Sequence, residues 1–459
     1  MTIGPSPQDT IAALATPLGE GGIAVIRITG RQALSQADQV FTPLGKSSFL
    51  PTHAASHTVQ YGFIHRAGAR VDEVLLTVLK APRTYTREDT VEISCHGGMV
   101  VTRQVLEAVL STGVRMAQPG EFTQRAFLNG RIDLTQAEAV ADLIQARTQL
   151  AASAALEQVG GSLSQRIRKI RDELVHSLAH IEAHIDFPEE DIDPQTQSQL
   201  LQHLEATVQS MATLRSTARD GRILRQGVRA VILGRPNAGK SSLLNLLLGH
   251  ERAIVSPIPG TTRDTVEETA DVRGIPIVFV DTAGLRDTKD LVEAEGVRRS
   301  RAAAQNAELI LHVLDHSEPL GAEDEELIHQ FTQRPVIYIR NKCDLPGRLQ
   351  LPDSIHAIAL SAIHGEGLEQ LKDAIEQKVW LGQVHAENLP IAVNARQADA
   401  LKRGMEGVCR AVESLRQDAS LEWVALDIRV ALGALGELVG QVSTDDLLDS
   451  IFSQFCLGK

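Results

Sequence analysis

The chain has 459 residues, of which 45 are Lys or Arg, 58 are Asp or Glu and 3% are aromatic, and its formal net charge is −13. This excess of acidic residues argues against a protein that binds nucleic acid without a partner, because phosphate contacts need clustered Lys and Arg. The first 30 residues lack a basic segment followed by an apolar core, and no apolar run is long enough to span a membrane. We therefore expect a cytoplasmic protein of about three domains.

The first part of the chain alternates short apolar runs with Gly and Pro. The runs IAVIRI, EVLLTVL and TVEISC lie within residues 1–120, and this pattern predicts a mixed α+β domain. The four cysteines are scattered without the spacing of metal ligands, which is typical of free thiols.

A long helix is predicted after residue 160. Apolar residues there recur three or four positions apart, which places them on one helical face. These residues are Ile167, Ile170, Leu174, Leu178, Ile181 and Ile185. The acidic DFPEEDID at 186–193 ends this helix, and a second helical stretch covers about 195–218. Four basic residues on the first helix allow two interpretations, a contact with RNA or a solvated helix face. They are Arg166, Arg168, Lys169 and Arg171.

Between about 224 and 380, apolar β-type runs alternate with helical segments, and the rest of the chain is helical again. Such alternation predicts a parallel sheet with helices on both faces. The simplest architecture is an α+β domain followed by an all-α domain that is interrupted by an inserted α/β domain. The expected ranges are 1–120 for the α+β domain, 121–222 and 381–459 for the helical domain, and 223–380 for the insertion.

The segment GRPNAGKS fits the pattern G-x-x-x-x-G-K-[ST] between a predicted strand and a predicted helix. Gly234 and Gly239 allow backbone N–H groups to close around phosphates, and the helix N-terminus adds its positive dipole end. Lys240 would reach the β- and γ-phosphates, and the Ser241 hydroxyl would ligate Mg²⁺.

Four further motifs follow in the order found in GTPases. In PGTTRD, Thr262 would sense the γ-phosphate and complete the Mg²⁺ shell, and DTAG supplies Asp281 near the metal. NKCD and SAI each follow a predicted strand. The carboxylate of Asp344 in NKCD can accept from N1–H and the 2-amino group of guanine, a pair that adenine lacks. We therefore predict a GTPase domain.

The residues expected around the nucleotide come from all five motifs. They are Asn237, Ala238, Gly239, Lys240, Ser241, Ser242, Ser256, Pro257, Ile258, Pro259, Gly260, Thr261, Thr262, Asp281, Thr282, Ala283, Gly284, Asn341, Lys342, Asp344, Ser361 and Ala362. Leu285 stands where Ras-like GTPases carry the glutamine that orients the attacking water, and leucine cannot hold a water.

The whole chain resembles the MnmE family of tRNA-modification GTPases, also called TrmE. The resemblance includes DTIAALATPLGEGGIAVIRITG, TREDTVEISCHGG, PGEFTQRAFLNGRIDLTQAEAVADLI and the terminal DDLLDSIFSQFCLGK. It implies a folate-binding N-terminal domain through which the protein forms a homodimer, and an FAD-dependent partner, MnmG. Together the two proteins would add a carboxymethylaminomethyl or aminomethyl group to C5 of the wobble uridine, U34, of certain tRNAs. Given the acidic composition, the partner would hold most of the tRNA.

The resemblance also implies how GTP is hydrolysed without the glutamine. The family uses a glutamate in switch II, here Glu293, which could orient the water. On spacing alone, three nearby acids remain alternatives: Asp287, Asp290 and Glu295. In place of an arginine finger the family uses K⁺. The implied potassium ligands are Asn237, Ser256, Ile258 and Thr261, with serine at 256 where threonine is common.

For the folate, a 5-formyl-tetrahydrofolate or a related tetrahydrofolate, the resemblance implies four contacts: Arg27, Glu92, Arg131 and Lys459. Glu92 could accept from the pterin N–H groups, and the three basic side chains could meet oxygens or carboxylates. Cys456 is either a catalytic thiol or a packing residue.

Two alternative functions are a ribosome-assembly GTPase and a non-enzymatic scaffold that senses folate or nucleotide. The first shares PNAGKSSLLN and DTAGL but usually appends an RNA-binding module to its G domain. The second is disfavoured by the intact Lys240, Ser241, Thr262 and Asp281.

Overall fold

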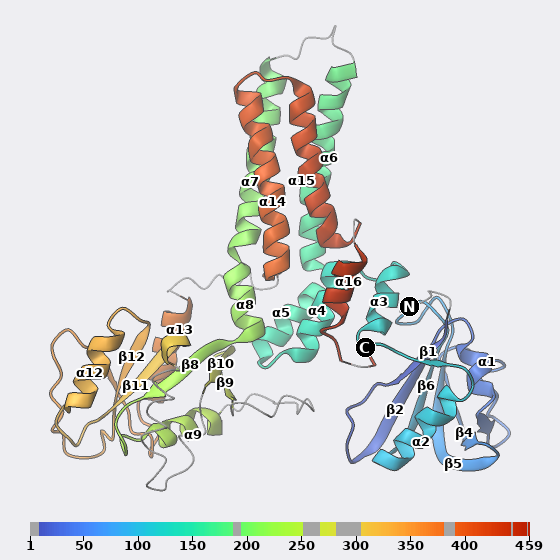
Figure 1. Cartoon of the computed structure of the whole chain (residues 1–459), viewed down its shortest axis with the longest axis horizontal. Coiled ribbons are helices and arrows are strands. Elements are labelled where there is room, and N and C mark those ends of the chain that lie inside the picture. Colours follow the sequence, from blue (N-terminus) through green and yellow to red (C-terminus); the bar gives the residue numbers. More distant parts are fainter. Residues whose placement is uncertain are drawn as a thin grey trace. The chain divides into compact units, whose positions relative to one another are not determined.

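The computed structural model describes residues 9–186, 194–250, 267–280, 304–380, 391–441, 444–456 and 458–459. Contacts divide the chain into two compact units (Figure 1). The first unit combines residues 1–141 with residues 436–459, and the second comprises residues 142–435. None of the helices in the described ranges combines the length and the apolarity that a membrane crossing requires.

The first unit contains a seven-stranded sheet in the order β3-β4-β5-β6-β2-β1-β7. All neighbouring strands pair antiparallel except β1 and β7, which are parallel. The strands are β1 (Ile11–Leu14), β2 (Gly21–Thr29), β3 (Phe41–Pro43), β4 (Thr58–Arg66), β5 (Ala69–Leu79), β6 (Thr90–Gly97) and β7 (Arg115–Met116). The strands predicted in IAVIRI, EVLLTVL and TVEISC are confirmed as parts of β2, β5 and β6.

Helices α1 (Ala33–Asp38) and α2 (Met99–Leu110) contact the strands of this sheet. On β2, Ala24, Ile26 and Ile28 are buried in the core that includes residues of both helices. Successive side chains of a strand point to opposite faces. Arg27 therefore lies on the other face of the sheet, where the candidate site of this unit is found.

The C-terminal segment belongs to the first unit. Helix α16 (Asp445–Phe452) contacts α3 (Glu121–Leu128), and its Leu448 and Phe452 share an apolar cluster with Leu134. At Gly120, where φ is 72°, an added Cβ would lie 2.5 Å from the carbonyl oxygen of Phe452. Only glycine permits this close approach. Two helices, α4 (Leu134–Gln145) and α15 (Leu421–Val439), cross the boundary between the units.

The second unit contains a six-stranded sheet in the order β13-β12-β11-β8-β10-β9. Its strands are β8 (Val228–Leu233), β9 (Glu268–Val272), β10 (Ile275–Phe279), β11 (Leu309–Asp315), β12 (Val336–Asn341) and β13 (Ala357–Ala359). The predicted parallel sheet is confirmed except at one edge, where β9 pairs antiparallel with β10. Arg273 and Gly274 join the two strands with φ of 52° and 85°, as a tight two-residue hairpin requires.

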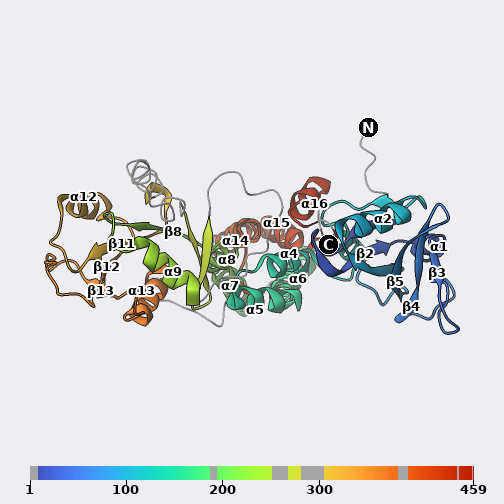
Figure 2. The same cartoon turned by 90° about the horizontal axis from the view of Figure 1, so that it is seen from below.

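Helices cover both faces of this sheet, as predicted (Figure 2). On β8, Ala230 and Ile232 belong to the cluster that contains residues of α9 (Lys240–His250) and α13 (Leu368–Trp380). Val231 and Leu233 belong to the opposite cluster, with residues of α12 (Ala322–Phe331). The strand is therefore apolar on both sides, as a central parallel strand must be.

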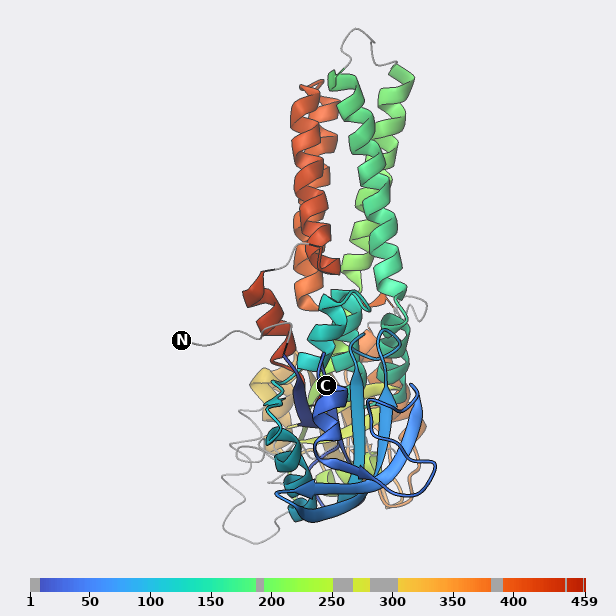
Figure 3. The same cartoon turned by 90° about the vertical axis from the view of Figure 1, so that its right-hand side faces the viewer.

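Long helices lie side by side in this unit (Figures 1 and 3). Helix α7 contacts α6, and it also contacts α14, which follows the sheet in the sequence. The helices of this part are α5 (Gln149–Val159), α6 (Ser162–Asp186), α7 (Pro194–Ser216), α8 (Ala218–Gln226), α14 (Ala395–Arg416) and most of α15. Both predicted helices are confirmed as α6 and α7. Of the basic cluster on α6, Arg166, Arg168 and Lys169 are exposed and Arg171 is half-buried.

Candidate functional site

The loop of residues 234–239 connects the central strand β8 to α9. Ligands of such sheets bind at the carboxyl ends of the strands, where the chain direction switches sides. Gly234 has φ of 139°, and an added Cβ would lie 2.2 Å from the carbonyl oxygen of Val313. At Gly239, with φ of 98°, a Cβ would lie 2.0 Å from Nδ2 of Asn341. Both predicted glycines are therefore required by close contacts with neighbouring strand ends.

Lys240 begins α9, and its ammonium is held within the loop. Its Nζ donates to the carbonyl oxygens of Gly234 at 2.9 Å and Arg235 at 2.8 Å. Ser241 and Ser242 occupy the first turn of the helix. Backbone N–H groups and a lysine thus converge at one helix N-terminus, an arrangement that suits an anion such as a phosphate.

Asn341 connects three of the predicted motifs. Its Nδ2 donates to the carbonyl oxygen of Ala238 at 2.8 Å, and its Oδ1 accepts from the backbone N–H of Ala362 at 3.0 Å. The Ser361 hydroxyl donates to Asp344 at 2.7 Å. This bond lowers the pKa of Asp344, so the exposed carboxylate stays ionised as an acceptor.

Lys342 of NKCD has a partner that the sequence analysis missed. Its Nζ lies 2.6 Å from Oδ2 of the buried Asp315 at the end of β11. Burial raises the pKa of Asp315, but hydrogen bonds from Lys342 and Ser317 lower it overall. The only sequence signal was an aspartate that ends the apolar run LILHVLD.

Eleven of the residues predicted around the nucleotide, and the proposed catalytic residue, lie outside the described residues. They are Ser256, Pro257, Ile258, Pro259, Gly260, Thr261, Thr262, Asp281, Thr282, Ala283, Gly284 and the proposed catalytic Glu293.

In the first unit, three of the four residues predicted to bind folate are close together. Arg27 and Glu92 stand opposite each other on β2 and β6, and Nε of Arg27 lies 2.8 Å from Oε1 of Glu92. Nη1 of Arg27 donates to the carbonyl oxygen of Gly458 at 3.4 Å. The C-terminal Lys459, which follows Gly458, therefore lies near the pair of Arg27 and Glu92. Burial lowers the pKa of the Lys459 ammonium, repulsion from Arg27 lowers it further, and Glu92 opposes both effects. Arg27 pairs with Glu92, and Lys459 lies close enough to both to feel their charges. Two cations near one carboxylate favour a ligand that brings a negative charge.

Arg131, the fourth predicted residue, lies beside an aromatic ring. Its guanidinium is 4.7 Å from the ring centroid of Tyr85, and its Nη1 donates to the Tyr85 carbonyl at 3.1 Å. Tyr85 in turn shares a hydrogen bond of 3.0 Å with Thr123 on α3. The neighbouring Phe122 has its ring centroid 5.7 Å from the guanidinium carbon of Arg27. Helix α3 thus connects Arg131 with Arg27.

Cys456, three residues before the C-terminus, is exposed. Its side chain is therefore accessible to solvent, whereas the preceding Phe455 is buried in the cluster with Leu134 and Phe452.

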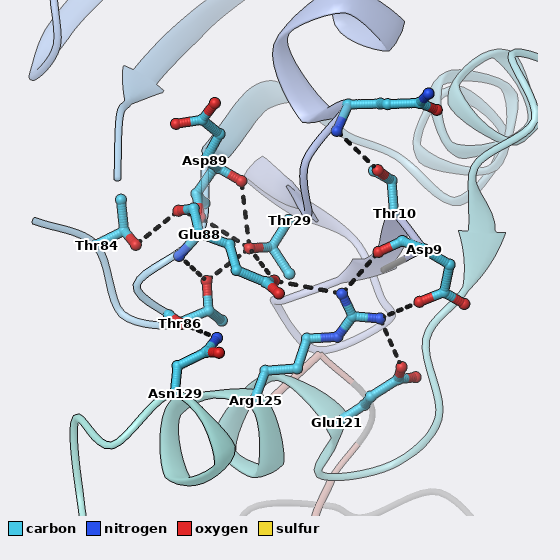
Figure 4. A network of polar contacts seen from close by, with 12 residues as sticks. Asp9, Thr10, Thr29, Thr84, Thr86, Glu88, Asp89, Glu121, Arg125 and Asn129 are labelled. Atoms are coloured by element: carbon cyan, nitrogen blue, oxygen red, sulfur yellow. Dashed lines mark hydrogen bonds and ion pairs between the residues drawn. The ribbon is translucent and has the colours of Figure 1, made fainter. Parts of the chain in front are cut away.

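A buried charge network fixes α3 beside this candidate site, and the sequence analysis missed it (Figure 4). The guanidinium of Arg125 lies between Asp9, Glu88 and Glu121. Arg115 adds a second guanidinium, which lies 2.6 Å from Glu121 and 2.8 Å from Asp9. The available signal was the spacing of Glu121 and Arg125, because residues four positions apart meet on a helix.

The network also keeps the buried carboxylate of Glu121 ionised. Burial raises the pKa of Glu121, which is 2% exposed, but hydrogen bonds from Arg115, the Gln118 N–H and Arg125 lower it overall. Glu88 belongs to the segment that carries Tyr85, and Thr86 of the same segment contacts Thr29 on β2 at 2.6 Å. The network therefore connects α3, the 84–90 segment and the start of β1.

Comparison with known proteins extends over both units. A family model described as "MnmE helical domain" matches residues 134–456, and one described as "GTP-binding protein TrmE N-terminus" matches residues 10–131. The tRNA modification GTPases MnmE of Bacillus velezensis and Bacillus subtilis are each 44% identical to this chain, over 98% of it and 100% of their own lengths. The chain belongs to the MnmE family. It is a GTP hydrolase of tRNA modification, and the multidomain layout expected from the sequence is confirmed.

Among solved structures, Era of Aquifex aeolicus bound to GDP and AlF4⁻ matches 39% of this MnmE-family chain and 66% of its own, at 28% identity and a TM-score of 0.26.

Proposed function

We propose that this chain is a potassium-dependent GTPase that acts with the FAD-dependent MnmG. Together they would add a carboxymethylaminomethyl or aminomethyl group to C5 of U34 in certain tRNAs, with a one-carbon unit from a tetrahydrofolate. The observation that supports this proposal best is the cluster of Arg27, Glu92 and Lys459 in the same chain as the P-loop. In this proposal the α/β domain is an insertion into the helical domain, and the N-terminal α+β domain has a folate-binding fold.

The chemistry of the N-terminal cluster suits a reduced folate. Glu92 can accept from the pterin amino and ring N–H groups, while Arg27, Arg131 and Lys459 can meet oxygens or carboxylates of the ligand. The Tyr85 ring, which already stacks with Arg131, offers an apolar face. The exposed thiol of Cys456 near the same C-terminus is available for a catalytic role.

The nucleotide site would use the residues already described. Lys240 would leave its carbonyl partners for the phosphates, and Asp344 would select guanine. The hydroxyls of Ser241 and Thr262 would hold Mg²⁺, an ion that prefers oxygen ligands. Magnesium would neutralise charge on the β- and γ-phosphates.

Potassium would replace the arginine finger beside the phosphates. The support comes from Asn237, a P-loop asparagine with φ of 60°, together with the three proposed ligands Ser256, Ile258 and Thr261. We expect fast GTP hydrolysis in KCl and slow hydrolysis in NaCl at equal ionic strength, and Asn237→Ala should remove the difference. Equal rates of the unaltered protein in the two salts would contradict a role for potassium.

Water activation is assigned to Glu293. Glu293→Ala should lower turnover by about 10²–10⁴-fold and leave GTP affinity nearly unchanged, as loss of a general base or water-orienting group does. Asp287→Ala and Glu295→Ala are the matched controls. If one of the controls loses turnover while Glu293→Ala does not, the assignment is wrong.

Homodimer formation through the N-terminal domain has support in the sheet itself. Val59, Tyr61 and Leu75 are exposed, and Tyr61 and Leu75 are paired across β4 and β5. Exposed apolar side chains that lie together mark contact surfaces. Leu75→Glu should shift the sedimentation coefficient from dimer to monomer, and an unchanged dimer would locate the contact elsewhere.

The decisive experiment is complementation of a strain that lacks its own gene for this protein, with wobble-uridine modification measured by mass spectrometry of tRNA. The unaltered gene should restore the modified uridine, and Lys240→Ala should not. Normal modification in the deletion strain, together with a defect in ribosomal subunits, would favour the alternative of a ribosome-assembly GTPase. The net charge of −13 makes MnmG the expected holder of the tRNA, so the assay is performed with MnmG present.

A further inference from the structure

The second residue of the P-loop, Arg235, directs its side chain toward the segment that begins α12. Its Nε lies 2.6 Å from Oδ2 of Asp324, and its Nη2 donates to the carbonyl oxygen of Pro319 at 3.1 Å. A weaker contact of 3.4 Å joins Nη1 to the exposed Glu318. An added Cβ on Gly321 would lie 2.9 Å from Nη1, so this glycine leaves room for the guanidinium.

Asp324 is 1% exposed and depends on Arg235 for charge compensation. Its Oδ2 also accepts from the backbone N–H of Gly321 at 3.4 Å, as part of the cap of α12. Its Oδ1 lies 3.7 Å from Nε2 of the buried His312, and within the described residues neither of these two atoms has a hydrogen-bond partner. A buried carboxylate that loses its guanidinium partner is strongly disfavoured. The pair of Arg235 and Asp324 therefore fixes the side chain of a P-loop residue.

The backbone of the same residue holds the phosphate-binding lysine. The carbonyl oxygens of Gly234 and Arg235 accept from Nζ of Lys240. Arg235 is consequently bound at both ends: its side chain is fixed by α12, and its main chain contacts Lys240. A helix cap alone does not require an arginine from this loop, because the Gly321 N–H already reaches the carboxylate.

We propose that Asp324 is a positioning residue for nucleotide binding, which holds the backbone of the P-loop in place through Arg235. A loop that is ordered before the ligand arrives loses less entropy when the ligand binds. GTP and GDP both carry the α- and β-phosphates that this loop surrounds. The pair of Arg235 and Asp324 should therefore raise the affinity for both nucleotides equally. It should not change the rate of the chemical step.

The test measures GTP and GDP dissociation constants by titration calorimetry with Mg²⁺ and K⁺, and steady-state GTP hydrolysis, on the full chain. Arg235→Ala and Asp324→Asn should each lower the affinity for GTP and for GDP about tenfold. Each should raise KM for GTP by the same factor and leave kcat within about twofold of the unaltered value. Asparagine can still accept from the Gly321 N–H, so Asp324→Asn keeps the helix cap. The double variant should be no weaker than either single variant, because the two residues act as one unit.

Two further variants separate positioning from folding. Arg235→Lys should recover part of the affinity, since lysine can still pair with Asp324, and Glu318→Gln should have no effect. Unchanged affinity in Arg235→Ala would overturn the proposal. A lower melting temperature of Asp324→Asn without a change in affinity would also overturn it, as would additive losses in the double variant.

Discussion

The two candidate sites of this chain are built in different ways. The nucleotide site takes Gly234, Gly239 and Lys240 from one short loop, and its main contacts come from the backbone. The N-terminal site takes Arg27, Glu92 and Lys459 from segments far apart in the sequence. The Arg27 side chain joins them by its contacts with the Glu92 carboxylate and the Gly458 carbonyl. A site that depends on backbone shape leaves a continuous motif in the sequence, whereas a site that depends on converging side chains leaves only single residues.

The two regions also differ in how charge is arranged. Asn341, a neutral side chain, connects the loops of the nucleotide site. The N-terminal site instead rests on two arginines and three carboxylates, of which Arg125 and Glu121 are buried. The N-terminal site should therefore be more sensitive to the loss of a single charge and to acid.

The largest expected effect that distinguishes the two sites is on the affinity of the nucleotide site for guanine. Asp344→Asn should weaken GTP binding by about 10⁴-fold, as expected when a hydrogen-bonding group that reads the base loses its match. It should improve binding of xanthosine triphosphate, whose 2-oxo group can accept from an amide. Binding of 5-formyl-tetrahydrofolate should not change. Asp353→Asn, on an exposed aspartate outside the motif, is the control. If Asp344→Asn keeps its preference for GTP, Asp344 does not read the base.

The next effect compares two arginine networks. Arg125→Met should destabilise the first unit by about 3–5 kcal/mol, because it leaves carboxylates buried without their cation. Hydrogen exchange followed by mass spectrometry should show the loss in peptides of β1 and β6. The matched control is Arg273→Met, whose partners on α13 are Glu369, Asp373 and Glu376.

The network around Arg273 is far more accessible to water than that of Arg125, and pairs of this kind contribute little. Peptides of β9 and β10 should therefore exchange at the same rate in Arg273→Met and in the unaltered protein. Similar losses of protection in the two variants would contradict the distinction between the buried and the accessible network.

A smaller effect is expected on the stability of the first unit at low pH. The pKa of Glu121 is lowered from its ordinary value of 4.5 in the folded state. Its ionised form therefore stabilises the first unit above about pH 4.5, and this contribution is lost as the pH falls through the lowered pKa. Exchange protection of β1 and β6 should decrease on acidification below pH 4.5, and less steeply in Glu121→Gln. Identical pH dependence in the two proteins would show that Glu121 is not responsible.

The sequence predicted the parts of the fold that local patterns determine. The P-loop, NKCD and the α6 face follow from glycine positions, strand ends and helical spacing, all within short windows. Strand β9 was missed because ETADV mixes polar and small residues, and its pairing depends on the turn at Arg273 and Gly274. The pairs of Lys342 with Asp315 and of Arg235 with Asp324 were missed because they join separate segments.

The central claim is that one chain holds two separate sites, and its most direct test is removal of the last two residues. A variant without Gly458 and Lys459 should lose measurable binding of 5-formyl-tetrahydrofolate in titration calorimetry, because one of two cations beside Glu92 is gone. The same protein should hydrolyse GTP at the unaltered rate. Unchanged folate affinity in this variant would contradict the account, since the C-terminus would then not belong to the binding site.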